Sequence, residues 1–539
     1  MSAPSYDDCR ARFRWADLLD ALGWRGRATV NLAETLVDRH ADAGRVALRW
    51  VGAAGATRDL SHADLARETS RFANWLASVG VRQGDRVAVV MPRLPETIAI
   101  LLGTWRAGAV YVPIFAGFGA DAIRHRVRDS GARVVCIHAS LRDKLQGPFA
   151  PAPIVLTIGG AQAGDVAYAD ALRDQPDVAA PVPCARHEPA ALIYTSGSTG
   201  PSKGVALATN LVAAIWPAMR YGADLQPDDV FWPTGDPGWG YGLVCYALAL
   251  AMGVPVTMWE ALPTAETALA FMAARRVTNL ATVPTLLRGI MALGAARVRD
   301  FDITMRRVSS CGEPLNAEVV RFFRAVWNVT PMDQFGSSEQ GIPCGNLAAT
   351  SMAVKPGSMG RAMPGHRVTV IDEAGAELPP DAVGLIAVAP ERDGTYALDY
   401  WNAPAGTPGF RRGDWIVTGD LGRRDADGYL WFEGRNDDVI KSAGYRIGPF
   451  EVESAILTHP AVAEAAVVGK PDALRGQIVK AFVVLKSGAA PRDGLADEIV
   501  AAVRELIGAH QYPREIAFVA DLPKTTTGKI QRFKLRELA

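Results

Sequence analysis

Short runs of β-branched and apolar residues alternate with segments of helical periodicity along the first two-thirds of the chain. The pattern predicts a strand at residues 86–91, a helix at 95–107 and a second strand at 110–113. A helix at 120–130 and a strand at 133–137 follow. Strands separated by helices of this length imply parallel sheets covered on both faces. The alternation returns later, with strands predicted at 191–194, 277–283, 307–310 and 330–334 and helices at 285–293 and 317–326.

The last third of the chain has a different pattern. From residue 365, shorter alternating strands separated by turns predict a mainly antiparallel, β-barrel-like unit. After the charged turn at 435–438, helices at 450–457 and 495–507 and strands at 461–468, 479–485 and 515–519 predict a compact α+β unit that is long enough to fold alone. We therefore predict an α/β protein. Its large N-terminal domain, residues 1–435, combines two parallel-sheet α/β subdomains with the β-barrel-like subdomain, and a small, mobile α+β C-terminal domain spans residues 436–539.

One apolar stretch is long enough to be weighed against a membrane span. Residues 241–259 are apolar and carry no charge. Gly253 and Pro255 interrupt the stretch, and the sequence has no second segment of this kind. We predict a buried helix followed by a strand, and no integral membrane segment.

Composition excludes several classes of protein. The 539 residues include 57 Lys and Arg against 57 Asp and Glu, so the formal net charge is zero. This balance argues against nucleic-acid binding by bulk positive charge and against a polybasic membrane anchor. Six scattered cysteines without a CxxC pair argue against a disulfide framework and a zinc site of the usual spacing. With no signal-peptide pattern at the N-terminus, we expect a cytoplasmic protein that binds anions, if at all, through local clusters.

The strongest local motif runs from Tyr194 to Gly204, with the sequence YTSGSTGPSKG. Closely spaced glycines allow backbone N–H groups to converge on an anion, hydroxyl groups add donors, and Lys203 adds positive charge. The motif is not a Walker A loop, because Lys203 is followed by glycine. A flexible linker is a poor alternative, since the motif joins a predicted buried strand to another apolar segment. We therefore predict a phosphate-binding loop.

This loop and six further motifs resemble those of the adenylate-forming superfamily, which includes acyl-CoA synthetases, peptide-synthetase adenylation domains and luciferases. The further motifs follow in the family's order over residues 194–530: CGEP at 311–314, QFGSSE at 334–339, TGD at 418–420, GRNDD at 434–438 with GYRI at 444–447, and PKTTTGKI at 523–530. The resemblance covers essentially the whole chain and is greatest to the medium-chain acyl-CoA synthetase group.

The resemblance implies a role for each motif residue and three ligands: ATP, Mg²⁺ and coenzyme A. It makes Lys529, Glu339 and Thr195 catalytic, with Glu339 also the metal ligand. It places the hinge at Asp437 and the CoA tunnel at Gly444, Tyr445 and Arg446, and it puts Arg124 and Arg126 in a stretch like the CoA-phosphate contact region. The implied nucleotide contacts are Ser196, Gly197, Ser198, Thr199, Gly200, Lys203, Gly312, Glu313, Pro314, Gln334, Phe335, Gly336, Ser337, Ser338, Asp420 and Arg435.

Physical chemistry supports several of these roles. A carboxylate just beyond a strand, as predicted for Asp420, can accept two hydrogen bonds from a ribose diol. Mg²⁺ takes few protein carboxylates and leaves room for phosphates, which suits Glu339. Residues 524–536 hold five basic residues and no acidic one, so Lys529 can neutralise charge that develops on a phosphate. No protein nucleophile is required, because the substrate carboxylate attacks the α-phosphorus of ATP.

Other catalytic patterns fail on spacing. The segment GSSEQG at 336–341 misses the esterase GxSxG pattern. The segment GWGYG at 238–242 lacks the GxGxxG spacing of a nicotinamide site. The eight histidines include no HExxH pair.

Three positions in the sequence predict the size of the acid that the enzyme activates. Trp239 and Gly240 lie in a segment that resembles the acyl-pocket stretch of short- and medium-chain synthetases. In acetate-specific members a tryptophan stands three residues before the magnesium glutamate, where this chain has Gly336. We therefore predict an AMP-forming acid–CoA ligase for a medium-chain or short branched carboxylic acid, which releases AMP and pyrophosphate. An aryl or short-chain acid, such as propionate or butyrate, is the alternative.

Two other functions use part of the same machinery. A ligase that loads a separate carrier protein would share the adenylation motifs. A non-enzymatic nucleotide sensor would not need Lys529 or the hinge. Acetylation of Lys529 would remove a required charge, so we also predict a lysine acetyltransferase and deacetylase as partners. No nucleic-acid partner is expected.

Overall fold

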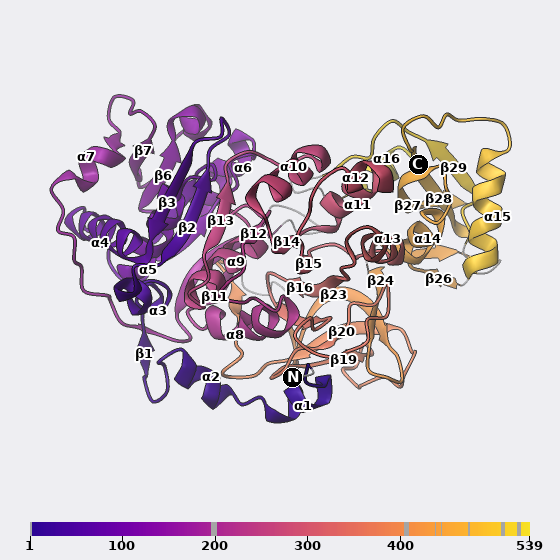
Figure 1. The fold of residues 1–539 in the computed structure, drawn as a ribbon, viewed down its shortest axis with the longest axis horizontal. Coiled ribbons are helices and arrows are strands. Elements are labelled where there is room, and N and C mark those ends of the chain that lie inside the picture. The colour runs from indigo at the N-terminus through magenta and orange to yellow at the C-terminus, as the bar shows by residue number, and fades with distance from the viewer. Residues whose placement is uncertain are drawn as a thin grey trace.

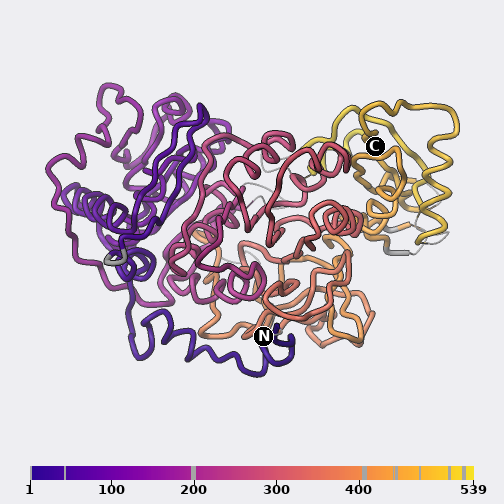
Figure 2. The backbone as a smooth tube through the Cα atoms, viewed as in Figure 1, coloured from indigo at the N-terminus to yellow at the C-terminus, as the bar shows by residue number. Residues whose placement is uncertain are grey.

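The computed structural model describes residues 3–195, 202–403, 409–436, 438–442, 445–472, 475–507, 512–524 and 530–539. The two N-terminal sheets lie at the left and centre of Figure 1, and the small C-terminal domain lies at the right-hand end of the long axis. Figure 2 follows the backbone between the two termini. Near the N-terminus, the Tyr6 hydroxyl donates a hydrogen bond over 2.9 Å to the carbonyl oxygen of Ala362, which lies in the edge strand β18 (Arg361–Ala362) of the second sheet.

The first sheet has a mainly parallel centre. Within the described residues it has eight strands, in the spatial order β21 (Ala397–Tyr400), β11 (Lys203–Ala208), β10 (Pro189–Thr195), β5 (Val110–Pro113), β4 (Arg86–Val90), β6 (Val134–His138), β7 (Ile154–Ile158) and β8 (Val166–Ala167). Strands β10 to β8 are parallel, whereas β11 is antiparallel to both β10 and β21. Its accompanying helices are α3 (Leu32–Leu36), α4 (His62–Ser78), α5 (Pro95–Arg106), α6 (Ala120–Ser130) and α7 (Tyr168–Arg173).

The second sheet repeats this arrangement. Within the described residues it has nine strands, in the order β18 (Arg361–Ala362), β17 (Gly341–Gly345), β16 (Pro331–Ser337), β15 (Arg307–Cys311), β14 (Asn279–Thr282), β12 (Phe231–Pro233), β13 (Val256–Trp259), β2 (Val46–Val51) and β3 (Thr57–Ser61). Strands β16 to β2 are parallel. Its helices are α8 (Leu211–Pro217), α9 (Gly240–Ala251), α10 (Ala265–Arg275), α11 (Pro284–Ala292), α12 (Ala295–Arg299) and α13 (Ala317–Trp327).

The third sheet and the C-terminal domain follow. The third sheet is antiparallel, as predicted, with β19 (Arg367–Ile371), β20 (Gly384–Ala389), β22 (Arg411–Arg412), β23 (Trp415–Arg424) and β24 (Leu430–Arg435). The C-terminal domain contains β25 (Ile440–Ser442), β26 (Tyr445–Ile447), α14 (Pro449–Ile456), β27 (Val462–Asp472), β28 (Gly476–Leu485), α15 (Leu495–Ile507), β29 (Glu515–Phe518) and α16 (Arg532–Glu537). The remaining elements are α1 (Tyr6–Arg12), α2 (Trp15–Ala21), β1 (Thr29–Val30), η1 (Asp38–Ala43), η2 (Ala139–Leu145), β9 (Cys184–Ala185) and η3 (Ala218–Gly222).

The apolar stretch at 241–259 is a buried helix and strand, which confirms the sequence prediction. Every residue of α9 from Gly242 to Ala251 is buried, because the helix is apolar on all sides and packs in the main hydrophobic core. Strand β13 follows it in the second sheet. No helix among the described residues is long and apolar enough to cross a membrane.

Candidate active site

The motif residues gather where parallel strands of both large sheets end. Thr195 ends β10, Gly312 follows β15, and Glu339 follows β16. The carboxyl edge of a parallel sheet is the usual place for a ligand, because successive strands deliver their following loops to one edge. Residues 311–314 and 334–339, which belong to two separate motifs in the sequence, are neighbours here, since Cys311 pairs with Gln334.

The predicted phosphate loop connects two antiparallel strands. Thr195, the last residue of β10, pairs with Lys203, the first residue of β11. The predicted contacts Ser196, Gly197, Ser198, Thr199 and Gly200 lie outside the described residues. Lys203 is half-buried, and its Nζ atom lies 5.2 Å from the centroid of the Tyr400 ring. This cation–π contact fixes where the lysine charge lies relative to the hairpin.

Tyr400 connects the phosphate hairpin to the predicted magnesium ligand. Its hydroxyl donates a hydrogen bond to Glu339 Oε1 over 3.2 Å, and its ring makes the cation–π contact with Lys203. Glu339 is only 9 % exposed, and burial raises the pKa of its carboxyl, with Asp420 raising the pKa further. A buried carboxylate of this kind is stabilised by a cation. The structure therefore brings together Lys203 and Glu339 through a tyrosine that the sequence motifs did not include.

The donor set suits Mg²⁺ better than a metal held entirely by protein. Among the described residues, no three His, Cys, Asp or Glu side chains form a metal cluster. Mg²⁺ is usually bound by one or two carboxylates together with substrate phosphates and water. Glu339 beside the phosphate hairpin fits that pattern. Ser337 orients it, since the Ser337 hydroxyl accepts from the Glu339 backbone N–H over 3.3 Å.

The predicted ribose ligand, Asp420, lies inside a strand and not beyond its end. The sequence pattern ended the strand at residue 417, but β23 continues to Arg424. The pairing of β23 with β20 shifts register at this point, and Gly419 has a φ of +83°. The Thr418 hydroxyl donates to Asp420 Oδ2 over 2.5 Å, and Arg435 Nη1 lies 3.4 Å from Oδ1. Asp420 and Arg435, predicted from separate motifs, are thus direct partners.

The predicted adenine segment begins immediately after β15. Gly312 has a φ of +98°, a conformation that only glycine adopts freely, and it turns the chain into Glu313 and Pro314. The Glu313 carboxylate accepts from the Thr285 hydroxyl at 2.8 Å and forms an ion pair with Arg288. Protein donors therefore already occupy this carboxylate, and it holds the segment against α11.

The remaining residues of the QFGSSE motif form the turn between β16 and β17. Gln334 is buried and donates to the Ala218 carbonyl, while its Oε1 atom has no hydrogen-bond partner among the described residues. Phe335, Gly336 and Ser337 end β16, and Ser338 follows. A Cβ atom added at Gly336 would lie 2.0 Å from the Gly341 carbonyl oxygen. The missing side chain therefore faces backbone, so this position does not simply open free space.

An aromatic cluster lies between the carboxyl edges of the two large sheets. Trp239 follows β12 and precedes α9, which begins at Gly240. Its ring centroid lies 5.9 Å from that of Phe115 and 5.4 Å from that of Phe118, both of which follow β5. Buried Asp236 orients this segment, since it accepts from the Gly238 N–H over 2.7 Å and pairs with Arg93 at 3.3 Å.

The predicted hinge separates two sets of contacts. Asn436 donates its backbone N–H to the Gly419 carbonyl over 2.8 Å, which attaches it to β23. The Asp438 backbone N–H donates to the Arg435 carbonyl over 3.0 Å, while its side chain accepts from Arg536 of α16 over 2.6 Å. Asp437, Gly444 and Lys529 lie outside the described residues, and the backbone of Tyr445 and Arg446 begins β26.

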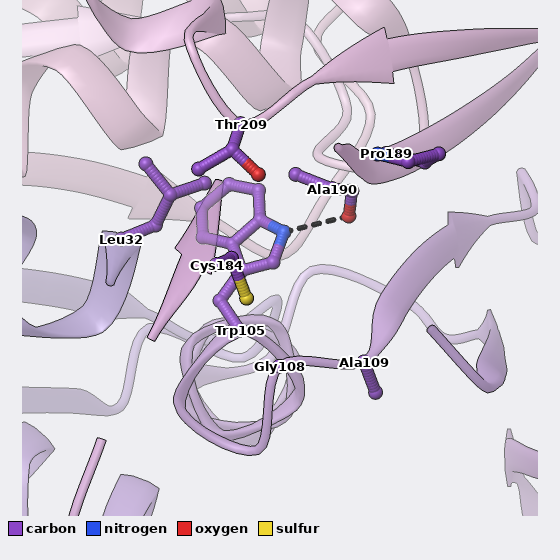
Figure 3. Close-up of a pocket in the computed structure, with 8 residues that line it drawn as sticks. All are labelled: Leu32, Trp105, Gly108, Ala109, Cys184, Pro189, Ala190 and Thr209. Carbon is purple, nitrogen blue, oxygen red and sulfur yellow. Dashed lines mark hydrogen bonds between the residues drawn. The ribbon is translucent and has the colours of Figure 1, made fainter. Parts of the chain in front are cut away.

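A small cavity beneath the start of β10 is separate from these residues (Figure 3). Figure 3 shows Leu32, Cys184 and Thr209 around the Trp105 indole, which donates to the Ala190 carbonyl oxygen over 2.8 Å. The space in which the centre of a water molecule fits is about 10 Å³. This is enough for about one water molecule, and too little for an acyl chain.

Comparison with known proteins agrees with the motifs. The family model described as AMP-binding enzyme matches residues 37–394, and the AMP-binding enzyme C-terminal domain matches residues 451–529. The chain is 35 % identical to acetyl-coenzyme A synthetase of Bacillus subtilis, over 99 % of this chain and 94 % of that protein. It is 34 % identical to human mitochondrial acyl-coenzyme A synthetase ACSM5, over 90 % and 85 %. The crystal structure of Brucella canis acyl-CoA synthetase is similar over 99 % of both chains, with 39 % identity and a TM-score of 0.79.

Proposed function

The chain belongs to the AMP-binding enzyme family and is an ATP-dependent, AMP-forming acyl-CoA synthetase, and we propose that its acid is a medium-chain or short branched carboxylate. The observation that carries the proposal is the β16–β17 turn. Because a Cβ at Gly336 would meet the Gly341 carbonyl oxygen at 2.0 Å, this backbone leaves no room there for the tryptophan expected in acetate-specific enzymes. Trp239, Phe115 and Phe118 would then line the acyl pocket, and we call these three aromatic residues the acyl wall.

A panel of acids tests the chain length. Each methylene buried against the aromatic wall contributes about 0.8 kcal/mol, or about fourfold in kcat/KM. We expect ATP–pyrophosphate exchange to rise from acetate through butyrate to hexanoate, and isobutyrate to exceed acetate. A preference for acetate would refute the proposal and place this enzyme with its relatives named acetyl-coenzyme A synthetase. A preference for benzoate would favour the aryl alternative.

We propose that adenylation uses positioning and charge and no protein nucleophile. The acid carboxylate attacks the α-phosphorus of ATP, and pyrophosphate leaves. The Thr195–Lys203 hairpin binds the phosphates, Asp420 accepts the ribose hydroxyls, and Glu339 would hold Mg²⁺, which supplies positive charge to the phosphate oxygens when it is bound. The segment at Gly312 and Pro314 would meet adenine through its backbone, because the Glu313 carboxylate is already bound by protein donors.

We propose that thioester formation follows a rotation of the C-terminal domain about Asp437. Adenylation needs Lys529 beside the phosphates, whereas thioester formation needs an open path for the CoA thiol along Gly444, Tyr445 and Arg446. Repeating the acid panel with CoA distinguishes this acceptor from a carrier protein, because a carrier-loading ligase would release no acyl-CoA. The relatives described above do not bear on acetylation of Lys529, which stays a prediction from the sequence.

A further inference from the structure

We propose that α6 is a brace that holds both ends of the phosphate hairpin, with Arg126 as its central positioning residue. The inference rests on the proposed nucleotide role of the Thr195–Lys203 hairpin. Three residues of α6, His125, Arg126 and Asp129, contact residues on either side of it. The brace comes from the sequence between β5 and β6, so it joins segments more than 60 residues apart.

On the entry side, α6 holds Tyr194, the residue before Thr195. The Tyr194 hydroxyl donates to Asp129 Oδ2 over 2.6 Å. Tyr194 is 3 % exposed, and burial raises the pKa of its phenol, so the phenol keeps its proton and remains a donor at neutral pH. The Asn402 side-chain amide donates to the Asp129 carbonyl oxygen over 2.7 Å and thereby ties the same turn of α6 to the segment after β21.

On the exit side, α6 holds Ser202, the residue before Lys203. His125 Nε2 lies 2.9 Å from the Ser202 carbonyl oxygen, and it donates when that nitrogen carries the proton. The His125 ring also packs edge-on against Tyr194, with centroids 6.1 Å apart. Two residues on one helix therefore fix the separation between the chain entering the loop and the chain leaving it.

Arg126 joins this brace to the acyl wall. Its guanidinium carbon lies 5.5 Å from the Tyr194 ring centroid and 4.2 Å from that of Phe118, which packs on Trp239 at 5.4 Å. A shift of Arg126 would therefore reach both the phosphate side and the acid side of the site.

The surroundings of Arg126 are unusual for a charged residue. It is only 6 % exposed, and no carboxylate forms an ion pair with it among the described residues. Its Nη1 atom donates a hydrogen bond to the Ala122 carbonyl oxygen of the same helix, over 2.8 Å. Burial lowers its pKa to about 10, so it stays charged at neutral pH. A buried charge without an anion is costly, and an apolar side chain of similar size would avoid that cost. The planar guanidinium of Arg126 can stack on the rings of Tyr194 and Phe118, whereas an apolar side chain cannot make cation–π contacts with them.

The test compares Arg126→Met with Arg128→Met, a matched control on the exposed side of the same helix. The readout is ATP–pyrophosphate exchange with the best acid found for the wild type. We expect Arg126→Met to raise the KM for ATP about tenfold or more, because misplaced contacts lose rate steeply. The KM for the acid should rise less, and the control should resemble the wild type. Arg126→Lys should recover part of the loss, since lysine keeps the charge but not the planar stack.

Other outcomes overturn the brace. Equal losses in both KM values together with a large fall in Tm would make Arg126 a residue of general stability. Normal pyrophosphate exchange together with a raised KM for CoA in a thioester-formation assay would make it a direct CoA contact. Tyr194→Phe keeps the ring but removes the hydrogen bond to Asp129, so the brace requires that this variant also raise the KM for ATP. The same variant tests the brace if Arg126→Met does not fold. Failure of the proposed function is separate, because it would appear as no exchange by the wild type with any acid.

Discussion

The N-terminal domain and the C-terminal domain hold their polar groups in contrasting ways. In the N-terminal domain, site residues from different sheets bond to one another: Tyr400 of the first sheet contacts Glu339 of the second. In the C-terminal domain, charged residues pair within the domain. Arg532 of α16 pairs with buried Glu453 of α14 at 2.7 Å, and Arg536 pairs with Asp438.

The C-terminal domain also has a hydrophobic core of its own. Residues from α14, α15 and four strands form it, including Ile440, Ile447, Val452, Ile456, Val467, Val483, Ile499 and Val503. Its contacts with the N-terminal domain include a hydrogen bond from the Asn316 amide to the Ser454 hydroxyl, over 2.9 Å, and packing of Phe450 on Phe432. A domain with its own core can change position without exposing that core, and the ion pairs named above join residues that would move together. The contrast therefore supports a preorganised nucleotide site and a separable C-terminal domain.

Removing the charge of Lys529, the proposed catalytic lysine, should have the largest effect. We expect Lys529→Ala to lower ATP–pyrophosphate exchange about 10²–10³-fold, because a positioned cation stabilises charge that develops on phosphate. Transfer of a preformed acyl-adenylate to CoA should remain close to wild type. Lys534→Ala, an exposed lysine of α16, is the matched control. Exchange that survives in Lys529→Ala would show that the C-terminal domain does not supply the catalytic charge.

A side chain in the predicted CoA tunnel should produce the opposite split. We expect Gly444→Leu to reduce thioester formation about tenfold or more while adenylation stays within about twofold, since only glycine permits such close approach. Gly444→Ala should give an intermediate loss. The measurements are pyrophosphate exchange and acyl-CoA release on the same preparations. If both half-reactions fall together, Gly444 serves the fold of the domain and not the tunnel.

Acid should destabilise the N-terminal domain through two buried histidines. Burial lowers the pKa of His62 and of His366 to about 4. The unfolded chain then binds more protons than the folded one between about pH 6.5 and pH 4, so the free energy of unfolding falls as pH falls through that range. The loss is at most about 3 kcal/mol per histidine.

The sequence offers a direct way to measure this in one domain. All 13 tryptophans precede residue 437, so tryptophan fluorescence during denaturation follows the N-terminal domain alone. Both ring nitrogens of His62 are buried without a hydrogen-bond partner among the described residues, so His62→Leu leaves no protein donor or acceptor unpaired. In this variant, the free energy of unfolding should fall less steeply as the pH falls from about 6.5 to 4. An unchanged slope would rule out His62 as a source of the acid sensitivity.

Local sequence pattern predicted much of the fold, because helix and strand periods are local properties. The helices at 120–130 and 495–507 agree with α6 and α15 to the residue, and Gly131, whose φ of +60° suits glycine, directly follows α6. The family's motifs named both members of the Asp420–Arg435 pair. Asp420 was nonetheless placed wrongly, as a residue beyond a strand end, because the register shift that allows its conformation depends on pairing with β20.

Tyr400 and the aromatic partners of Trp239 were missed for a related reason. Tyr400 carries no motif, and its role arises only because β21 pairs with β11 almost 200 residues away in the chain. Phe115 and Phe118 did have a usable signal, since they directly follow a predicted strand of a parallel sheet. A search of the residues that follow each predicted parallel strand would have identified them as candidates for the site.

The smallest effect should come from the hydrogen bond between the two domains. Asn316 directly precedes α13, and Ser454 lies in α14, so this bond joins the two domains in the arrangement seen here. Asn316→Ala and Ser454→Ala should each change the ratio of exchange to thioester rates by up to about fivefold, the equivalent of about 1 kcal/mol. The double variant should match either single variant, because both remove one interaction. Thr458→Ala, which removes a hydrogen bond within the C-terminal domain, should leave the ratio unchanged. Additive effects in the double variant would mean that the two residues act separately and that this contact does not position the C-terminal domain.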